Sequence, residues 1–433
     1  MESINHTCIG ASHIAEDKVC QDYSLSVNLD GLCAAVVSDG HGGKRYFRSD
    51  TGSETACKIT IAKIKEFVKN FDKTLIAGKP FTQCLAQYDP KNTHTDKLFP
   101  IFNQLFTSIV STWYAQIEQH AHDNHLTTAE REICEPEWIS DFENGIKIEK
   151  SYGCTLMAAV FMPEYWFAFH IGDGKMIALQ NNPTYMEPVP WDDRCFLNGT
   201  TSLCDNNALD EFRYCYCGDG CFPDAVFLGS DGMDDTFGAT DNLADFYIKI
   251  AELLSENASE KVLADIKETL PNLSSKGSKD DMSLAVIFDR EKIAANLKTY
   301  EKWQHENLNV KITEKQKHTE KIEKEKQSKL VQYESAKAKK ADKENEITKL
   351  LTEYESLKKE CEEAESGIEK LKNFLTAKNL KVSLLKDSLD TAETELKKIE
   401  KDLDFSARDL QASENELRKE KAELQELINR KKI

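Results

Sequence analysis

Five aspartates stand where short apolar runs of the sequence begin or end. Asp39, Asp173 and Asp231 follow such runs and are each followed by glycine, while Asp22 and Asp280 precede them. Carboxylate oxygens are hard ligands that suit Mg²⁺ and Mn²⁺. Carboxylates held close together repel one another, so either the pKa of one rises or a cation binds among them. If the five ends meet in space, the sequence predicts a divalent-metal site.

The chemistry of such a site depends on the five aspartates acting together. An aspartate beside a glycine is common in turns, and for any single one of the five a turn is the simpler interpretation. Two divalent ions about 4 Å apart can share a bridging water, lower its pKa and hold a phosphoryl oxygen. The set therefore indicates metal-assisted hydrolysis, with a phosphate ester as a candidate substrate.

The pattern before residue 290 supplies elements that could bring these ends together. Short β-rich runs separated by turn signals indicate strands, and longer runs with apolar residues at helical spacing indicate helices. The two kinds do not alternate strictly, which favours an α+β fold with packed antiparallel sheets over a doubly wound sheet. The turns at 162–165 and 172–175 would join three strands into an antiparallel meander. Strands are expected at 32–37, 155–161, 165–171, 176–179, 224–229 and 282–288, and helices at 53–71, 98–121 and 243–259.

Composition and charge restrict the partners and the compartment. The 433 residues carry a formal net charge of −19, and all of the acidic excess falls within residues 1–290, because the remainder is nearly neutral. An acidic domain repels nucleic acid and anionic membrane surfaces, so neither is an expected partner. No apolar run approaches the length of a membrane span, and the start of the chain lacks a basic stretch followed by an apolar one. With 13 cysteines, an odd number, we expect a cytoplasmic protein with reduced thiols.

The composition changes near residue 290. Beyond it the chain has no proline and a single glycine, Gly367, and it favours helix. Every seventh residue from Ile347 to Leu424 is apolar or nearly so, which predicts a left-handed coiled coil about 120 Å long. A solvated single helix is the alternative. The companion series is interrupted by polar residues, so oligomer number and strand direction stay open, and so does a fold-back with a bend at 376–381. The interrupting residues are Lys378, Ser406, Ser413 and Glu420.

Six blocks of residues 8–290 carry a resemblance to a known family. The chain resembles the type 2C (PPM-type) metal-dependent protein serine/threonine phosphatases, and most of all their bacterial branch. "SDG" or "GDG" alone would be a weak signal, but the ordered set is specific. The blocks are QDYS (21–24), SDGHGG (38–43), SYGCTLMAAV (151–160), HIGDGKMIAL (170–179), GSDGMDD (229–235) and GSKDDMSLAVI (277–287).

The resemblance implies a fold and a reaction. The family fold is a β-sandwich of two antiparallel sheets flanked by helices, with two Mn²⁺ or Mg²⁺ ions in a cleft at one end. The implied reaction is hydrolysis of phosphoserine or phosphothreonine in phosphoproteins by a metal-activated water, without a phosphoenzyme. His41 matches the proposed general acid for the leaving oxygen, a role that suits an imidazole whose pKa lies near neutrality.

The resemblance also implies the metal ligands. Asp39 would bridge both ions, with the Gly40 carbonyl as a further ligand. Asp231 and Asp280 would hold the first ion. Asp22 would act mainly through a metal-bound water, and Asp173 matches the acid for a third, more weakly bound ion.

The sequence departs from the family in three places. Many members have two acids where this chain has Gln21-Asp22, but glutamine occurs there in bacterial members. Asp17 stands where eukaryotic members carry the arginine that grips the substrate phosphate, so Lys18 or Arg45 could take that role. Residues 75–148 make the segment after His41 long, which predicts an inserted helical cap that shapes substrate access or covers an edge.

The predicted organisation is a catalytic domain at 1–290 and an α-helical coiled coil at 291–433, which would self-associate or bind a partner helix through 347–428. A pseudophosphatase that binds phosphoproteins as a scaffold, and a structural filament protein that carries the domain as cargo, are the rival functions. The cysteines between Cys195 and Cys221, and His122 with His125, are weaker metal candidates, because buried thiols and a polar helix end explain them as well. "TTAE" (127–130) reads as a helix capping box.

Overall fold

The computed structural model of the chain describes residues 1–29, 31–87, 89, 91, 96–195, 199–365 and 372–431. It divides into two compact units, Met1–Gln304 and His305–Ile433. Within the described ranges, every helix is too short or too polar to cross a membrane.

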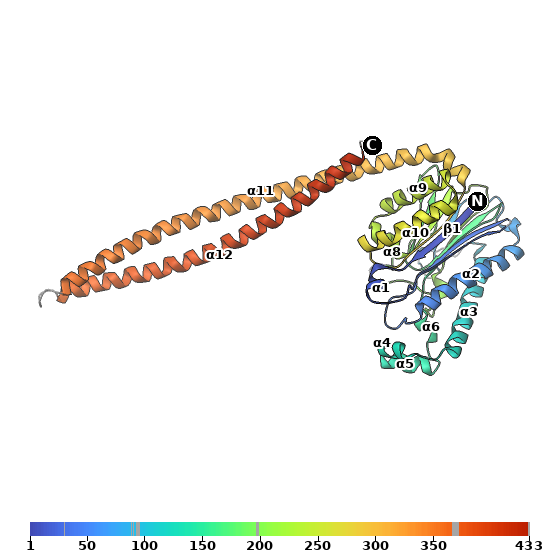
Figure 1. Cartoon of the computed structure of the whole chain (residues 1–433), viewed down its shortest axis with the longest axis horizontal. Helices are drawn as coiled ribbons and strands as arrows, with labels where there is room; N and C mark the ends of the chain where they lie inside the picture. Colours follow the sequence, from blue (N-terminus) through green and yellow to red (C-terminus); the bar gives the residue numbers. More distant parts are fainter. Residues whose placement is uncertain are drawn as a thin grey trace. The chain divides into compact units, whose positions relative to one another are not determined.

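The first unit contains two antiparallel sheets packed face to face (Figure 1), as the sequence predicts. Sheet A has the order β1-β11-β10-β7-β8, and sheet B has the order β2-β3-β5-β6-β9-β4. The strands of sheet A are β1 (Glu2–Cys8), β7 (Lys175–Leu179), β8 (Tyr185–Met186), β10 (Ala225–Gly229) and β11 (Met282–Phe288). Those of sheet B are β2 (Tyr23–Leu29), β3 (Leu32–Ser38), β4 (Thr82–Cys84), β5 (Leu156–Phe161), β6 (Trp166–Ile171) and β9 (Arg213–Cys217).

The continuous apolar runs of the central strands follow from burial on both faces. In β3, Cys33, Ala35 and Val37 pack in the core between the sheets, while the alternate residues Ala34 and Val36 pack in the core beneath the helices that cover sheet B. Successive strand residues point to opposite faces, so a strand covered on both sides must be apolar throughout.

Helices cover the outer face of each sheet (Figure 1). On sheet B lie α2 (Ser49–Asn70) and α3 (Phe99–Asp123), whose Phe102, Phe106 and Trp113 are buried. On sheet A lie α8 (Asp231–Phe237), α9 (Thr240–Glu256) and α10 (Ser259–Lys276). The short elements are α1 (Ala11–Ala15), the 3₁₀ helix η1 (Lys73–Leu75), α6 (Ile148–Ser151) and α7 (Ala208–Glu211).

The predicted three-stranded meander is wrong at its second turn. β5 and β6 form the expected antiparallel pair, but residues 172–174 carry the chain from β6 in sheet B to β7 in sheet A. Gly172 has φ +126°, a value that residues with a side chain rarely adopt. The sequence of a short Gly-rich link does not distinguish one that closes a hairpin from one that crosses between sheets. The crossing places Asp173 where the two sheets meet.

Residues 75–148, where an inserted helical cap was expected, supply a strand and a helix of the main layers as well as two added short helices. β4 pairs with β9 at the edge of sheet B, and α3 belongs to the helical layer of the core. The added helices are α4 (Thr128–Ile133) and α5 (Pro136–Glu143). The predicted capping box is confirmed, since the Thr127 side chain accepts from the Glu130 N–H and the Glu130 side chain accepts from the Thr127 N–H. Glu130 also accepts from Nε of the buried Arg48 at 2.6 Å, which ties α4 to the start of α2.

The first turns of α11 (Arg290–Glu365) belong to the first unit, beyond the boundary expected near residue 290. Ile293 and Tyr300 are fully buried in the core of sheet A. Asp224, which precedes β10, accepts hydrogen bonds from Asn296 Nδ2 at 2.6 Å and from the Tyr300 hydroxyl. The stretch from Ile293 to Gln304 therefore completes the core as well as beginning the long helix.

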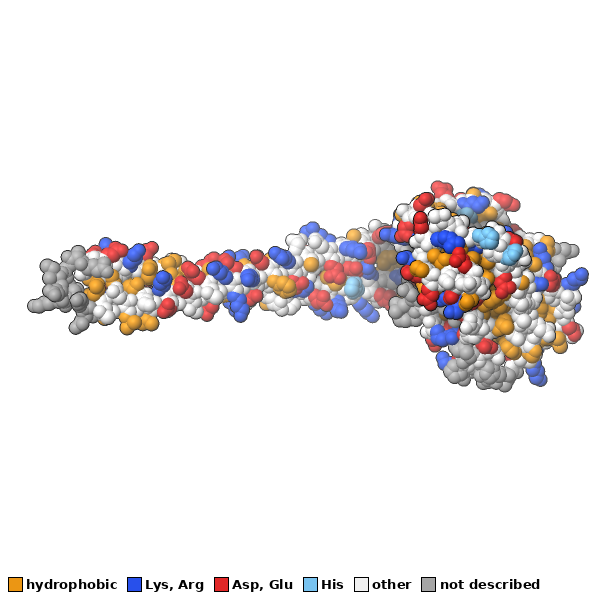
Figure 2. Space-filling model, turned by 90° about the horizontal axis from the view of Figure 1, so that it is seen from below, with side chains coloured by type: hydrophobic (Ala, Val, Ile, Leu, Met, Phe, Trp, Pro, Cys, Tyr) orange, Lys and Arg blue, Asp and Glu red, His pale blue; other side chains and the backbone are white. Residues whose placement is uncertain are grey.

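The second unit is a hairpin in which the rest of α11 pairs antiparallel with α12 (Lys372–Arg430). Ion pairs run in opposite order along the two helices: Lys315 with Glu420 (2.8 Å), Lys329 with Asp409 (3.0 Å) and Lys343 with Glu395 (2.5 Å). Figure 2 shows basic and acidic side chains interspersed along its surface. The bend suggested at 376–381 is wrong, because these residues lie inside α12, which begins at Lys372.

The heptad positions predicted for α12 form its inner face. Its buried residues are Leu389, Ala392, Ser413, Leu417 and Glu420, all from the two predicted series. The buried residues of α11 in this unit follow the same spacing apart from Asn307, and are Asn307, Ile312, Thr319, Ile322, Leu357 and Cys361. Ile368 of the predicted series lies outside the described residues. The repeat thus pairs two helices of one chain, a possibility that the sequence left open.

Candidate active site

A single cleft collects the five predicted aspartates. Asp39 follows β3, Asp231 begins α8 directly after β10, and Asp173 lies in the link between the sheets. Asp22 and Asp280 stand just before β2 and β11, so strand ends from both sheets contribute. The sandwich therefore brings together residues that are far apart in the sequence.

One group in the cleft consists of Asp39, Asp173 and Asp231. One carboxylate oxygen from each lies within 4.8 Å of the others. The Asp39 backbone is held by Thr155, whose hydroxyl accepts from the Asp39 N–H at 3.1 Å and whose N–H donates to the Asp39 carbonyl at 2.8 Å. This pairing fixes the strand end and leaves the Asp39 carboxylate facing the two others.

Burial and mutual repulsion raise the pKa of these acids. Burial, reinforced by the neighbouring Asp231 and Asp22, holds the pKa of Asp39 well above its usual range. Burial and the charge of Asp281 do the same for Asp22. Burial raises the pKa of Asp231 to about 6, and the charges of Asp173 and Asp280 add to the rise. The cluster thus favours protons or cations over bare carboxylates.

The donor set fits divalent cations. All side-chain ligands in the cluster are hard carboxylate oxygens. Asp22 is buried, and its Oδ2 atom has no hydrogen-bond partner among the described residues, as expected of an oxygen that needs a cation or water. A side chain on Gly40 would lie 2.4 Å from the Gln21 carbonyl, so only glycine allows the backbone to run this close to the residue before Asp22.

The metal-free protein is expected to lose stability as pH rises. Asp231 has a folded-state pKa of about 6, above its value of about 3.9 in an unfolded chain. Its contribution is fully present below pH 4 and is lost as pH rises through 6, by on the order of 3 kcal/mol. Thermal unfolding in EDTA between pH 4 and 7.5 checks this sign. Asp231→Asn should flatten the slope, as should saturating Mn²⁺, and a slope that neither change affects would contradict the assignment.

A second cluster, His13 with Asp281, was not singled out by the sequence analysis. Asp281 is buried and accepts from the N–H groups of Gly10 and Gln21 at 2.6 Å each, and it lies 2.9 Å from His13 Nδ1. Burial raises the pKa of Asp281, but the hydrogen bonds from His13 and the two N–H groups outweigh it, so the pKa lies below its usual value. Asp281 therefore ties the segment that carries Asp22 to the start of β11. Nothing in the local sequence distinguishes His13, because its partner lies 268 residues away.

His41 also lines the cleft, as predicted. Its backbone N–H donates to the Gly153 carbonyl at 3.0 Å, and its ring makes an edge contact with Tyr46. His41 Nε2 lies 2.7 Å from the Ser202 hydroxyl, a partner that sequence reasoning missed. Burial lowers the pKa of His41 to about 4, so the ring is neutral near pH 7.

The two candidate phosphate-binding residues are placed differently. Lys18 lines the cleft, and its Nζ lies 2.6 Å from Glu16. The Arg45 guanidinium lies over the Trp138 ring of α5, 5.6 Å from the ring centroid, and Arg45 is not among the residues that line the cleft. Only Lys18 of the two therefore belongs to the cleft wall.

The cysteines and histidines considered as weaker metal candidates do not come together into a metal site among the described residues. Cys215 and Cys217 are buried in the core between the sheets, whereas Cys221 is exposed. Cys195 contacts the Gly172 carbonyl. His122 pairs with its neighbour Asp123. Over the described ranges, the groups with metal-ligand spacing contain no cysteine.

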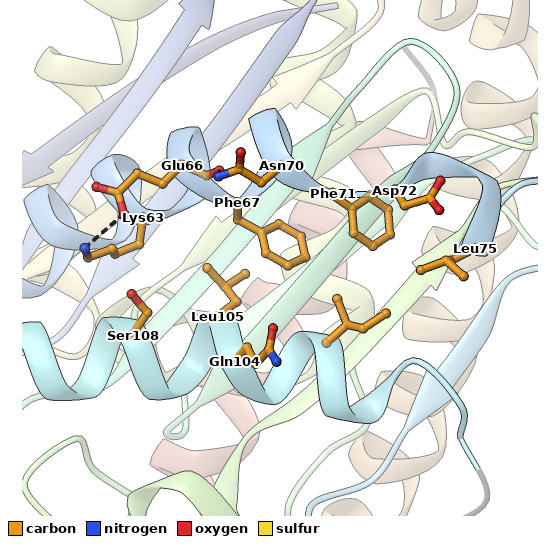
Figure 3. Close-up of a pocket in the computed structure, with 11 residues that line it drawn as sticks. Lys63, Glu66, Phe67, Asn70, Phe71, Asp72, Leu75, Gln104, Leu105 and Ser108 are labelled. Carbon is orange, nitrogen blue, oxygen red and sulfur yellow. Dashed lines mark hydrogen bonds and ion pairs between the residues drawn. The ribbon is translucent and has the colours of Figure 1, made fainter.

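A groove between α2 and α3 has different chemistry (Figure 3). Phe67, Phe71 and Leu105 form its floor, and Lys63 and Glu66 at its edge pair with each other at 3.0 Å. It shares no residue with the acidic cleft. The acidic cleft is therefore the candidate active site.

The model of the family described as protein phosphatase 2C matches residues 9–270, which include Asp22, Asp39, Asp173 and Asp231 but end before Asp280. The chain belongs to this family. The enzyme is accordingly a protein serine/threonine phosphatase, and the family is metal-dependent, in agreement with the acidic cleft. Among curated proteins, no sequence matches the chain.

Solved structures with a similar fold include several bacterial phosphatases. A bacterial serine phosphatase is 15% identical, covers 67% of this chain and 99% of its own, and has a TM-score of 0.39. The S. agalactiae serine/threonine phosphatase is 13% identical, with coverages of 66% and 99% and a TM-score of 0.38. A C. elegans sex determining protein is 14% identical, with coverages of 68% and 67% and a TM-score of 0.41.

Proposed function

We propose that the phosphatase hydrolyses phosphoserine and phosphothreonine monoesters of phosphoproteins with the help of two Mn²⁺ or Mg²⁺ ions and a third, more weakly held one. The observation that carries the proposal is the half-buried group of Asp39, Asp173 and Asp231, with oxygens within 4.8 Å of one another, in a chain of this family.

The cleft residues divide the ligand roles among them. Asp39 would serve both principal ions, with the Gly40 carbonyl as a further ligand. Asp231 and Asp280 would hold the first ion and Asp173 the third, while Asp22 would act mainly through water. When bound, such ions supply positive charge that makes water a better nucleophile at neutral pH and stabilises the charge on the phosphoryl oxygens. Asp280 is exposed and Asp22 is buried. This difference fits direct binding of an ion by Asp280 and binding through water by Asp22.

His41 would act on the leaving group. As the P–O bond to the serine or threonine breaks, the oxygen that leaves takes a proton, and His41 would donate it. The ring is positioned by Gly153, Tyr46 and Ser202 at the edge of the cleft. The negative charge of a bound phosphate would raise the low pKa of the imidazole.

Lys18 would bind the substrate phosphate. Lys18→Ala should raise KM for a phosphothreonine peptide about tenfold, since a charge-assisted contact is lost, and should change kcat less. Arg45→Ala is the matched control, because it removes an equal charge that lies outside the cleft wall. Steady-state kinetics in Mn²⁺ give both constants, and a larger KM effect for Arg45→Ala would reverse the assignment.

The hairpin would serve association or recruitment through residues 347–428. Its inner faces already contact each other, so a partner helix or a second copy would use the outer surface. Light scattering of the whole chain and of residues 1–304 compares their masses. A defined oligomer formed by the whole chain alone would support self-association, while an open-ended assembly would favour a filament.

One observation favours a second function, a scaffold that binds phosphoproteins without turnover. Burial keeps the pKa of His41 at about 4, which disfavours the protonated ring that a general acid needs. Hydrolysis of p-nitrophenyl phosphate and a phosphothreonine peptide in Mn²⁺, Mg²⁺ or EDTA separates the two. Metal-dependent turnover would establish the enzyme mechanism, and tight phosphopeptide binding without turnover would establish the scaffold.

A further inference from the structure

Residues 199–205 form a segment over the cleft that is anchored at several points. Lys150 Nζ of α6 lies 3.0 Å from Asp205, and the Leu203 N–H donates to the Cys154 carbonyl at 2.9 Å. The Thr201 hydroxyl accepts from the Gly172 N–H at 2.9 Å. The segment is thereby joined to α6, to Cys154 two residues before β5, and to the link that carries Asp173. Apart from Cys204, one of the weaker metal candidates, sequence analysis assigned no role to this segment.

The hydroxyl of Ser202 lies at the centre of this segment. Ser202 is 3% exposed. Its Oγ atom is 2.7 Å from His41 Nε2, 3.0 Å from the Cys154 carbonyl oxygen and 3.2 Å from Cys204 Sγ, and it accepts from the Cys204 N–H at 3.3 Å. A hydroxyl has one proton to donate and can accept twice, and a thiol is only a weak partner. The roles of the three stronger partners are therefore restricted.

Only one assignment turns the contacts with His41, the Cys154 carbonyl and the Cys204 N–H all into hydrogen bonds. The Cys154 carbonyl can only accept and the Cys204 N–H can only donate, so the Ser202 proton must go to Cys154. The remaining contact is then a bond from His41 Nε2–H to Ser202 Oγ. If His41 carried its proton on Nδ1, Ser202 could donate to only one of two acceptors, the Cys154 carbonyl oxygen or His41 Nε2. The other acceptor would face a lone pair of Ser202 Oγ at close range, which is unfavourable for buried groups. The surroundings of Ser202 thus select the tautomer of His41.

We propose that Ser202 is a positioning residue for proton transfer. It holds the His41 ring with Nε2 protonated and occupied, which leaves Nδ1 as the atom that exchanges a proton in the cleft. His41 Nδ1 forms no hydrogen bond with any described residue, and His41 lines the cleft. With substrate bound, the charge of the phosphate would favour the imidazolium, which carries a proton on each ring nitrogen. As the P–O bond breaks, the Nδ1 proton passes to the leaving oxygen, and the neutral ring that remains keeps Nε2–H bonded to Ser202. This inference rests on the proposed role of His41 as proton donor.

The leaving group provides the test. An alkoxide from phosphothreonine needs a proton, whereas p-nitrophenolate is a weak base that leaves without one. Ser202→Ala should lower kcat on a phosphothreonine peptide by about 100-fold, the lower range for general acid catalysis. On p-nitrophenyl phosphate the loss should stay under about threefold, and KM for both substrates should change little. A purely structural role would lower the two activities by similar factors.

Three further variants make the result decisive. Ser202→Thr keeps a hydroxyl and should recover most of the peptide activity. His41→Asn should show the same selectivity between substrates, and Ser202→Ala added to it should cause no further loss. Equal loss on both substrates, failure of threonine to rescue, or additive losses would overturn the inference about Ser202. If His41→Asn itself affected both substrates equally, the proton-donor role in the proposed function would fail instead, whatever the Ser202 result.

Discussion

Asp39→Asn is expected to lower kcat/KM toward a phosphothreonine peptide by at least about 1,000-fold, the loss of several kcal/mol of metal-dependent stabilisation. Asn keeps the shape of the side chain but removes the charge that faces Asp173 and Asp231 in the cluster. The measurement is steady-state hydrolysis in saturating Mn²⁺ and, separately, metal affinity by calorimetry. Both should fall together, because the same carboxylate would bind the ions.

The same substitution should make the metal-free protein more stable. Burial and the charges of Asp231 and Asp22 hold the pKa of Asp39 far above its usual range, so its ionised form is unfavourable in the folded state. Thermal unfolding in EDTA at pH 7.5 should therefore show a higher Tm for Asp39→Asn than for the unchanged chain. Asp265→Asn, at an exposed position on α10, is the matched control for the loss of one charge. A variant that loses activity and is also less stable without metal would indicate misfolding instead.

Ending the chain at Arg290 is expected to destabilise the catalytic unit by several kcal/mol, whereas ending it at Gln304 should not. The shorter chain loses Ile293 and Tyr300, which are fully buried in the core of sheet A. Removal of large buried side chains costs about 3–5 kcal/mol each. It also leaves the buried Asp224 without the hydrogen bonds from Asn296 and Tyr300.

Urea unfolding of the two truncated chains checks this second expectation. Residues 1–304 should unfold at the same urea concentration as the first transition of the whole chain, while residues 1–290 should unfold at a much lower one. Tyr300→Phe in the 1–304 chain isolates the bond to Asp224 and should cost about 1–3 kcal/mol. Equal stability of the two truncated chains would show that the first turns of α11 are only a connection. The outcome also decides which fragment is suitable for the metal-dependence assay.

Local patterns in the sequence were enough to predict the main helices and strands and the aspartates of the cleft. Strand β3 is apolar throughout because both its faces are buried, and Asp39 at its end is recognisable from the Gly40 that follows. The heptad series of α12 correctly identifies its inner face, because a seven-residue period marks one side of a helix whatever its partner is. The family assignment follows from blocks of this local kind in a fixed order.

Contacts between distant residues required the tertiary structure. Ser202 and His41 are 161 residues apart, and Asp281 and His13 are 268 apart, so neither pair can be predicted from spacing along the chain. The link at 172–174 reads as a hairpin turn, yet it crosses between sheets, since a short Gly-rich link permits either path.

The hairpin and the choice between Lys18 and Arg45 also depend on tertiary structure. A heptad repeat has the same pattern whether its partner is another chain or the preceding helix, and only the ion pairs from Lys315 to Lys343 of α11 reveal the antiparallel fold-back. Lys18 and Arg45 have equal charge, and the stacking of Arg45 on Trp138 removes it from the cleft wall. Periodicity and turn chemistry are local properties of the chain, whereas the choice of partner depends on how the layers pack.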